Sequence, residues 1–313
     1  MNVEDPDLPD LPDLNVVTGA FGYTGRYVAG RLLSMGARVR TLTGHPERHN
    51  PFGHRVSVAP LNFEDPPGLT ESLRGATTLY NTYWIRFAHG RETFERAVAN
   101  SLALIGAAKD AGVSRIVHIS ITNPSHGSPF PYFKGKSTVE QAIIDSGLSY
   151  AIVRPALIFG LEDILINNIA WLLRRFPIFI VPGKGDCLLQ PVDVEDLAQL
   201  ATSAGRGRDN VIFDAVGPET HTFDQLVRLI AETVKSRARV VHLGPGAALL
   251  ASRVIGLLVR DAMLTRDEVE GLNSNLLVSQ QPATGSTKLS VWLRQNGEHI
   301  GAAYASELRR HYR

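Results

Sequence analysis

Residues 16–26 read VVTGAFGYTGR and join a short apolar strand to a helix with one apolar face. Gly19 lets the chain turn sharply off the strand, Gly22 lets the backbone approach a pyrophosphate, and Gly25 lets the helix pack close to the sheet. The helix N-terminus then offers N–H groups and a positive dipole end to the phosphates. Between a strand and a helix, this spacing predicts a dinucleotide-binding turn. The alternative is a plain tight turn in an α/β domain.

The residues of this turn that are expected to contact the dinucleotide are Thr18, Gly19, Phe21, Gly22, Tyr23, Thr24 and Gly25. The end of the second strand separates NAD from NADP, because an Asp or Glu there binds the ribose hydroxyls and repels a 2′-phosphate. No carboxylate ends the strand here, and Thr43, His45 and Arg48 would instead line a phosphate, which arginine binds in bidentate fashion. The sequence therefore favours NADP over NAD, the alternative being that Arg48 is merely solvated.

Strands and helices alternate through the first half of the chain, which predicts a parallel sheet with helices on both faces. The carboxyl ends of such strands meet at one edge, where ligands bind. We expect a doubly wound α/β Rossmann domain formed by 14–155 with 188–215. A smaller, mainly helical substrate lobe is expected from 156–187 with 216–313.

The composition excludes some functions. The chain has 313 residues and a net charge of +1, so nothing suggests a nucleic-acid partner. Cys187 is the single cysteine and cannot form an internal disulfide, and no Cys/His cluster has metal-ligand spacing. We therefore expect a cytoplasmic protein without a metal site. Residues 1–13 are acidic and proline-rich, unlike a signal peptide, and are predicted to be a disordered tail.

Two apolar stretches approach the length of a membrane-spanning helix without reaching it. Arg174 and Arg175 interrupt Ile164–Val181, and Ala247–Val259 is shorter still. We expect both stretches to be buried helices of the second lobe, and peripheral contact with a membrane surface is the alternative.

The second informative stretch is PYFKGK at 131–136. Tyr132 and Lys136 are four residues apart and therefore share one face at the start of a helix. A phenol with a pKa of about 10 is a poor acid or base at neutral pH, but an ammonium beside it stabilises the phenolate. Ser120 and Thr122, at the end of the fifth strand, offer a hydroxyl for a substrate oxygen. The pattern predicts a proton-transferring tyrosine.

Together with the glycine turn, these residues resemble the short-chain dehydrogenase/reductase superfamily, in its extended and atypical members of the NAD-dependent epimerase/dehydratase type. The resemblance covers residues 14 to about 215 well and the remainder loosely. It implies that Tyr132 donates or accepts a proton, that Lys136 binds the nicotinamide ribose and tunes Tyr132, and that Ser120 orients the substrate. Asn100 matches a helix Asn that supports a proton relay, or else faces solvent.

Further cofactor contacts follow from the same resemblance. Asn62 stands where relatives often have an Asp against the adenine. Asn81 and Thr82 end the fourth strand, where the cofactor usually passes. Pro155 and Leu157 lie in a stretch similar to the loop beside the nicotinamide.

Two aspartates lie where a late strand meets a helix. Asp193 and Asp196 are expected to cap the helix that follows them.

Residues 81–84 (NTYW), 121–124 (ITNP) and 171–177 (WLLRRFP) resemble bacterial relatives of the Rossmann-type accessory subunit of respiratory complex I. That subunit binds NADPH and is not thought to turn over substrate. This chain departs from it by keeping both the tyrosine and the lysine.

The leading hypothesis is therefore an NADP-dependent oxidoreductase, or an epimerase/dehydratase-like enzyme with transient hydride transfer. Its substrate would be a small, apolar or amphiphilic hydroxyl or carbonyl compound. The alternative is an NADPH-binding accessory subunit or redox sensor with little or no turnover. A third hypothesis is a membrane-peripheral enzyme acting on a lipid or quinone-like molecule. The chain is expected to be a monomer or a homodimer.

Overall fold

The computed structural model describes residues 13–244, 246 and 275–306 of the chain. Its centre is a seven-stranded parallel sheet, which confirms the predicted doubly wound Rossmann fold. In spatial order the strands are β11 (Val211–Ala215), β6 (Ser149–Pro155), β5 (Arg115–Ile119), β4 (Ala76–Asn81), β1 (Leu14–Thr18), β2 (Arg38–Thr43) and β3 (Val56–Pro60). The direction of winding reverses between β1 and β4, and doubly wound sheets bind ligands at the carboxyl ends of such a pair.

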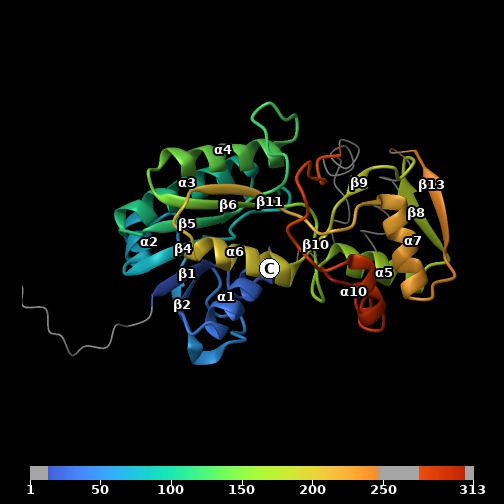
Figure 1. The fold of residues 1–313 in the computed structure, drawn as a ribbon, viewed down its shortest axis with the longest axis horizontal. Coiled ribbons are helices and arrows are strands. Elements are labelled where there is room, and N and C mark those ends of the chain that lie inside the picture. The colour runs from blue at the N-terminus through green and yellow to red at the C-terminus, as the bar shows by residue number, and fades with distance from the viewer. Residues whose placement is uncertain (1–12, 245, 247–274, 307–313) are drawn as a thin grey trace, which may run out of the picture.

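Helices cover both faces of this sheet (Figure 1). They are α1 (Tyr23–Ser34) and α6 (Val194–Arg206) on one face, and α2 (Pro66–Leu73), α3 (Phe94–Asp110) and α4 (Pro131–Asp145) on the other, with a short 3₁₀ helix η1 (Gly53–Arg55) before β3. One apolar cluster contains Val17 and Leu197, and the other contains Val16 and Leu104. Val16 and Val17 therefore face opposite layers, as the two-residue period of a strand requires.

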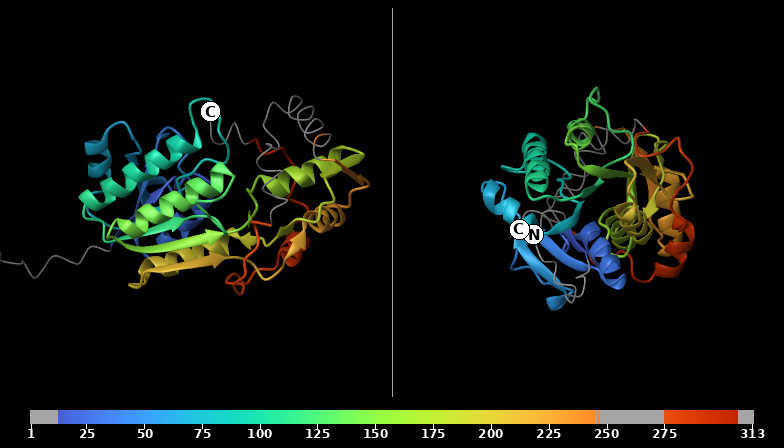
Figure 2. Two further views of the ribbon diagram at one scale, coloured as in Figure 1. Left: turned by 90° about the horizontal axis from the view of Figure 1, so that it is seen from above. Right: turned by 60° about the vertical axis from the view of Figure 1, so that its left-hand side comes forward.

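The second lobe lies at the other end of the long axis (Figures 1 and 2). Its elements are β7 (Ile158–Phe159), α5 (Leu165–Arg175), β8 (Ile178–Pro182), β12 (His221–Thr222), α7 (Phe223–Thr233), β13 (Arg239–Leu243) and α10 (Leu289–Asn296). Where the chain returns to the sheet domain, β9 (Leu188–Leu189) pairs with β12 and β10 (Val192–Asp193) pairs with β7. Phe159, Leu173 and Leu226 belong to its separate apolar core. The sequence did not predict β13, because its parallel partner β8 lies far earlier in the chain and no local pattern indicates the pairing.

Helix α4 begins at Pro131, so Tyr132 and Lys136 both lie near the start of a helix, as expected. Proline fits the first helical position, where its missing N–H has no intrahelical acceptor to lose. This start places Tyr132 in the first turn, one turn before Lys136. Strand β5 ends at Ile119, so that Ser120 follows the strand.

The two aspartates at the start of α6 have different roles. Asp193 caps the helix as predicted, because its carboxylate accepts from the N–H groups of Glu195 and Asp196. The same prediction is wrong for Asp196. Its carboxylate accepts from the N–H groups of Ser286 and Thr287, each at 2.7 Å, and so joins α6 to a distant segment.

Two predictions fall outside the described residues, namely the tail before Asp13 and the helix Ala247–Val259. Within the described ranges, no helix has the length and apolar character needed to cross a membrane. Within the same ranges, no group of three or more His, Cys, Asp or Glu side chains is placed to hold a metal ion.

Candidate functional site

The glycine turn leaves no room for a side chain at Gly25 and little at Gly22. Gly19 has a φ of +66°, in the left-handed region that favours glycine, and its N–H donates to the Leu42 carbonyl at 2.9 Å. A Cβ on Gly25 would lie 2.3 Å from the Gly19 carbonyl oxygen, and a Cβ on Gly22 would lie 3.2 Å from the same atom. Only glycine fits at position 25 without a backbone shift, which is the close helix approach that the spacing predicts.

The first turn of α1 has donors for an anion. The N-cap is Gly22, which has no side chain to cap the helix. No acidic residue lies in the first turn. The first N–H groups of a helix have no intrahelical acceptor, so those of Thr24 and Gly25 remain for another partner. Phosphate oxygens take this donor set at helix N-termini. The residues present therefore fit the pyrophosphate of a dinucleotide.

Side chains join β1 and β4 at the switch point. Thr18 Oγ1 accepts from the N–H groups of Thr82 (2.7 Å) and Tyr83 (3.1 Å), and Thr82 Oγ1 donates to the Thr18 carbonyl at 2.5 Å. Asn81 is 1% exposed, and its side-chain oxygen accepts from the Tyr83 N–H at 3.0 Å. The structure thus brings together three residues that the sequence assigned to the cofactor. Thr18 and Asn81 are buried, so they shape this edge through the backbone that they hold.

Tyr132 and Lys136 meet the same indole ring. Lys136 Nζ lies 4.6 Å from the centroid of the Trp84 ring, and the Tyr132 ring packs edge-on against that ring with 5.9 Å between centroids. Gly135 permits this approach, because a Cβ there would lie 3.0 Å from the indole. The tyrosine and the lysine therefore share one side of α4 and one neighbour from the loop after β4.

Lys136 is a buried cation. It is 3% exposed and donates to the Ile119 carbonyl at 2.8 Å. Burial lowers the pKa of its ammonium to about 7, because a low-dielectric environment disfavours the charged form, and the Glu140 carboxylate opposes this shift only in part. Lys136 therefore changes its charge near neutral pH.

Ser120 belongs to a buried polar network behind this pair. Its hydroxyl donates to the Glu140 carboxylate, which also accepts from Arg154 at both oxygens, with Nε at 3.0 Å from Oε1. The Glu140 side chain is 5% exposed, and its pairing with arginine offsets the cost of burying a carboxylate. Glu140 was not among the predicted site residues, although its spacing of four residues from Lys136 is a signal for it.

His118 lies on β5 and is 0% exposed. The Asn81 amide donates to its Nδ1 at 3.1 Å, and its Nε2 has no hydrogen-bond partner among the described residues. Burial, and then the charge of Lys136, hold the pKa of His118 well below the usual range. His118 is therefore neutral and adds no charge beneath the site.

Asn100 on α3 faces the loop after β4. Its amide donates to the Tyr83 hydroxyl at 2.8 Å and is half-buried, so it does not simply face solvent. Burial raises the pKa of the Tyr83 phenol, and the Asn100 hydrogen bond opposes that shift. The amide thus positions the loop that carries Trp84.

The turn after β2 gathers the residues that the sequence assigned to the adenosine end. The Thr43 hydroxyl accepts from the His45 N–H at 3.0 Å, and the Arg48 N–H donates to the His45 carbonyl at 3.2 Å. His45 Nδ1 also lies 3.4 Å from the exposed carboxylate of Glu47. Thr43, His45 and Arg48 therefore lie in one turn, and the carboxylate beside them is turned towards the imidazole.

The remaining predicted positions hold the surrounding loops. The Pro155 carbonyl accepts from the Thr122 N–H at 2.9 Å, and the Leu157 carbonyl accepts from the Val192 N–H at 2.8 Å. Asn62 is exposed after β3 and accepts from a backbone N–H two residues later at 3.0 Å. These loops border the same carboxyl edge of the sheet.

Comparison with known proteins agrees with this arrangement. Residues 19–161 match the family model described as NAD(P)H-binding. Subunit 9 of the NADH dehydrogenase (ubiquinone) 1 alpha subcomplex from Arabidopsis thaliana mitochondria is 25% identical over 283 residues, 84% of this chain and 70% of that protein. A (4-alkanoyl-5-oxo-2,5-dihydrofuran-3-yl)methyl phosphate reductase of Streptomyces griseus is 28% identical over 240 residues, 75% of this chain and 79% of the relative.

Solved structures share the fold. An NADPH-dependent quinone oxidoreductase from Escherichia coli, complexed with NADPH, superposes with a TM-score of 0.74 at 20% identity. The superposition covers 91% of this chain and 99% of the oxidoreductase chain. The UDP-glucose 4-epimerase of Thermotoga maritima superposes with a TM-score of 0.61 at 18% identity, over 74% of this chain and 86% of its own. The chain therefore contains an NAD(P)-binding Rossmann-type domain and is related to the complex I subunit, which confirms the resemblance seen in the sequence.

Proposed function

We propose that the chain is an NADP-dependent oxidoreductase, or an epimerase/dehydratase-like enzyme, in which Tyr132 and Lys136 move a proton at a substrate hydroxyl or carbonyl oxygen. The observation that carries this proposal is the buried ammonium of Lys136, with a pKa of about 7, one helical turn from Tyr132 at the dinucleotide edge. A lysine is rarely buried without a function, since burying its charge is costly. When bound, the nicotinamide supplies or accepts the hydride.

Each residue of the pair has a separate task. Tyr132 holds the transferred proton on its phenolic oxygen, within reach of a substrate oxygen. The charge of Lys136 favours the phenolate. Tyr132 therefore gives up its proton more readily, and a larger fraction of it is present as the base near neutral pH. Trp84 covers Lys136, which keeps water from the ammonium and strengthens its field.

The substrate is proposed to be apolar or amphiphilic. Besides the indole, Phe94 and Phe133 surround the Tyr132 ring, with centroids 6.0 and 5.6 Å away. Arg174, which could bind a pyrophosphate, instead donates to the Ile300 carbonyl (3.1 Å) and to another carbonyl of the second lobe. Arg175 lies over the ring of a tryptophan on its own helix. These contacts favour an apolar carbonyl compound over a nucleotide sugar, whose pyrophosphate needs free donors.

The division into lobes belongs to the same proposal. We assign residues 14–155 with 188–215 to cofactor binding, and 156–187 with 216–313 to the substrate. Separate apolar cores on the two sides of the molecule support this division.

NADP preference predicts a selective loss in Arg48→Ala. Because arginine pairs with the 2′-phosphate that only NADP carries, the NADPH dissociation constant is expected to rise about tenfold while that for NADH stays constant. Fluorescence titration of both nucleotides measures this, with Arg55→Ala, an exposed arginine of η1, as the matched control. An equal loss for both nucleotides would remove Arg48 from this role. Wild-type binding of NADH as tight as that of NADPH would overturn the preference.

A second candidate is an NADPH-binding accessory subunit with little turnover. The relation to a complex I subunit favours it, and so does the position of Ser120, whose hydroxyl is engaged by Glu140. The two candidates share the cofactor and differ in turnover alone.

A screen for NADPH oxidation separates these candidates. The wild-type chain is expected to oxidise NADPH in the presence of at least one apolar aldehyde, ketone or quinone, because the aromatic residues around Tyr132 suit such molecules. Absorbance of the reduced nicotinamide measures the rate for each compound and for polar sugars as the control. Tight NADPH binding with no turnover across the panel would favour the accessory subunit.

A further inference from the structure

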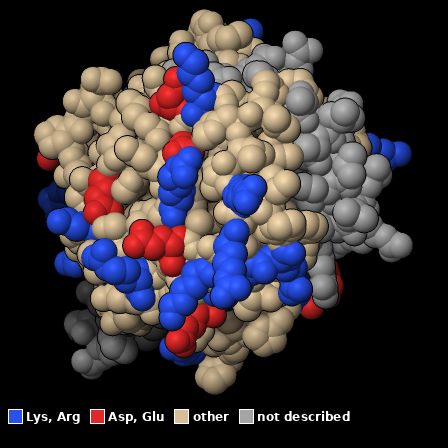
Figure 3. Space-filling view, turned by 90° about the vertical axis from the view of Figure 1, so that its right-hand side faces the viewer, with Lys and Arg blue, Asp and Glu red and all other residues tan. Residues whose placement is uncertain are grey.

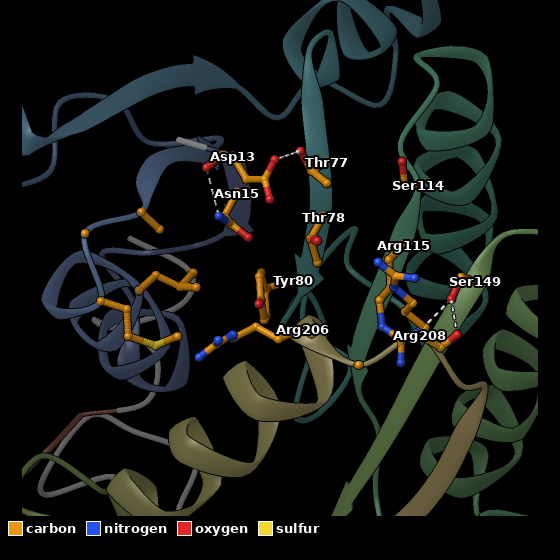
Figure 4. A pocket seen from close by; sticks show the side chains of 16 residues that line it. Asp13, Asn15, Thr77, Thr78, Tyr80, Ser114, Arg115, Ser149, Arg206 and Arg208 are labelled. Carbon is orange, nitrogen blue, oxygen red and sulfur yellow. Dashed lines mark hydrogen bonds between the residues drawn. The ribbon is translucent and has the colours of Figure 1, made fainter. Parts of the chain in front are cut away.

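A hollow lies at the edge of the sheet opposite the glycine turn. Its volume is about 790 Å³, and it is bordered by the starts of β1, β4, β5 and β6 and by the last turns of α1 and α6 (Figure 4). This volume lies in the range of small-molecule sites. The proposed function leaves this hollow unused, because the dinucleotide lies at the carboxyl ends of the same strands.

The side chains that line the hollow carry an excess of positive charge. Arg115, Arg206 and Arg208 line it against the single carboxylate of Asp13. The Asp13 carboxylate accepts from the Thr77 hydroxyl at 3.1 Å. Arg206 and Arg208 are exposed, and neither forms an ion pair within the described part of the chain. Two guanidinium groups are thus available to an anion at this edge.

Arg115 holds one side of the hollow in place. It is 5% exposed and donates to the carbonyls of Ala204 (3.0 Å) and Asp209 (2.8 Å) and to the Ser149 hydroxyl. Figure 4 shows Arg115 and Arg208 on the same side, beside Ser149. The C-terminal ends of α1 and α6 face this edge and disfavour an anion. Arg115 reduces that effect at α6, because it donates to the carbonyl of Ala204 in the last turn of that helix.

The opposite wall is apolar and the floor is closely packed. Leu32, Met35 and Ala37 line the hollow from the end of α1, and Met35 is 42% exposed. Tyr80 forms the floor against Gly205, where a Cβ would lie 2.1 Å from the phenolic oxygen. Figure 4 shows Arg206 extending from α6 towards α1, beneath Tyr80. A ligand here would meet Arg208 on one side, and Arg206 together with the apolar atoms of the α1 wall on the other.

We infer that this hollow is a second ligand site, for a small molecule that joins a phosphate or diphosphate group to an apolar part. Arginine recognises phosphate by paired, charge-assisted hydrogen bonds. Arg206 and Arg208 would bind phosphate oxygens from the two sides of the hollow, and the apolar side chains of the α1 wall would cover the rest of the ligand. The site is separate from the glycine turn, so both are open to ligands at once.

Calorimetric titration with pyrophosphate tests this site. The full chain is first saturated with NADPH, so that the glycine turn is occupied and cannot take the probe. Pyrophosphate is expected to bind the saturated wild type. In the double variant Arg206→Gln/Arg208→Gln, pyrophosphate binding is expected to weaken about tenfold or more, since two charge-assisted contacts are lost. NADPH affinity is expected to be the same in both proteins.

The matched control is Arg237→Gln/Arg239→Gln, which removes the same charge from exposed positions at the outer end of the second lobe. Figure 3 shows that end of the molecule, where Lys and Arg side chains gather. Pyrophosphate binding is expected to be unchanged in this control. Equal losses in the two double variants, binding abolished by NADPH, or no loss in the first variant would each overturn the inference. Failure of NADPH to bind would overturn the proposed function and leave the comparison between variants intact.

Discussion

Tyr132→Phe is expected to lower turnover by about a thousandfold or more, while the NADPH dissociation constant changes less than about twofold. The substitution removes only the phenolic oxygen that holds the proton. The ring keeps its edge-on contact with Trp84, at 5.9 Å between centroids, so the surroundings of Lys136 are preserved. Steady-state rates on a substrate found in the screen, together with nucleotide titration, measure both quantities.

Tyr150→Phe is the matched control, because Tyr150 lies near the start of β6, at the edge away from the glycine turn. Its turnover is expected to equal that of the wild type. A Tyr132→Phe variant that keeps most of its activity would show that another group transfers the proton. A large loss of NADPH binding in the same variant would assign Tyr132 to the nucleotide instead.

Lys136→Met is expected to remove a strong pH dependence from the free energy of unfolding. In the folded protein the pKa of Lys136 is about 7, against an ordinary value of 10.5. Between these values the unfolded chain binds more protons than the folded chain, so wild-type stability rises with pH. The rise is on the order of 5 kcal/mol between the folded and the unfolded pKa. This gain in stability is complete above the pKa that Lys136 has in the unfolded chain. It is lost as the pH falls through the pKa that Lys136 has in the folded protein.

Denaturant unfolding at pH 7, 8, 9 and 10 measures this effect as the difference between wild type and variant. Packing and the lost hydrogen bond to the Ile119 carbonyl change stability equally at every pH, so they do not alter the slope. Lys134→Met, which removes an exposed lysine from the same helix, is expected to keep the wild-type slope. A Lys136→Met slope equal to that of the wild type would mean that this ammonium is not buried in solution.

Much of the fold could be predicted because its signals are local. The glycine spacing requires a sharp turn and a close helix, and the structure has both, with a Cβ on Gly25 only 2.3 Å from the Gly19 carbonyl. Asp193 was predicted as a cap from its position alone, and it is one. The prediction was wrong for Asp196, because its partners Ser286 and Thr287 lie far along the chain. A helix cap can be predicted from residues adjacent in the sequence, whereas a contact between residues far apart in the sequence cannot.

The sequence by itself determined the α/β alternation, the dinucleotide turn and the spacing that puts Tyr132 and Lys136 on one helix face. These follow from backbone geometry within a few residues. Only the tertiary structure decided that Lys136 lies under Trp84, that Ser120 is bound by Glu140, and that arginines gather at the opposite edge of the sheet. Burial and electrostatic environment arise from residues far apart in the chain, so they exist only once the layers have packed.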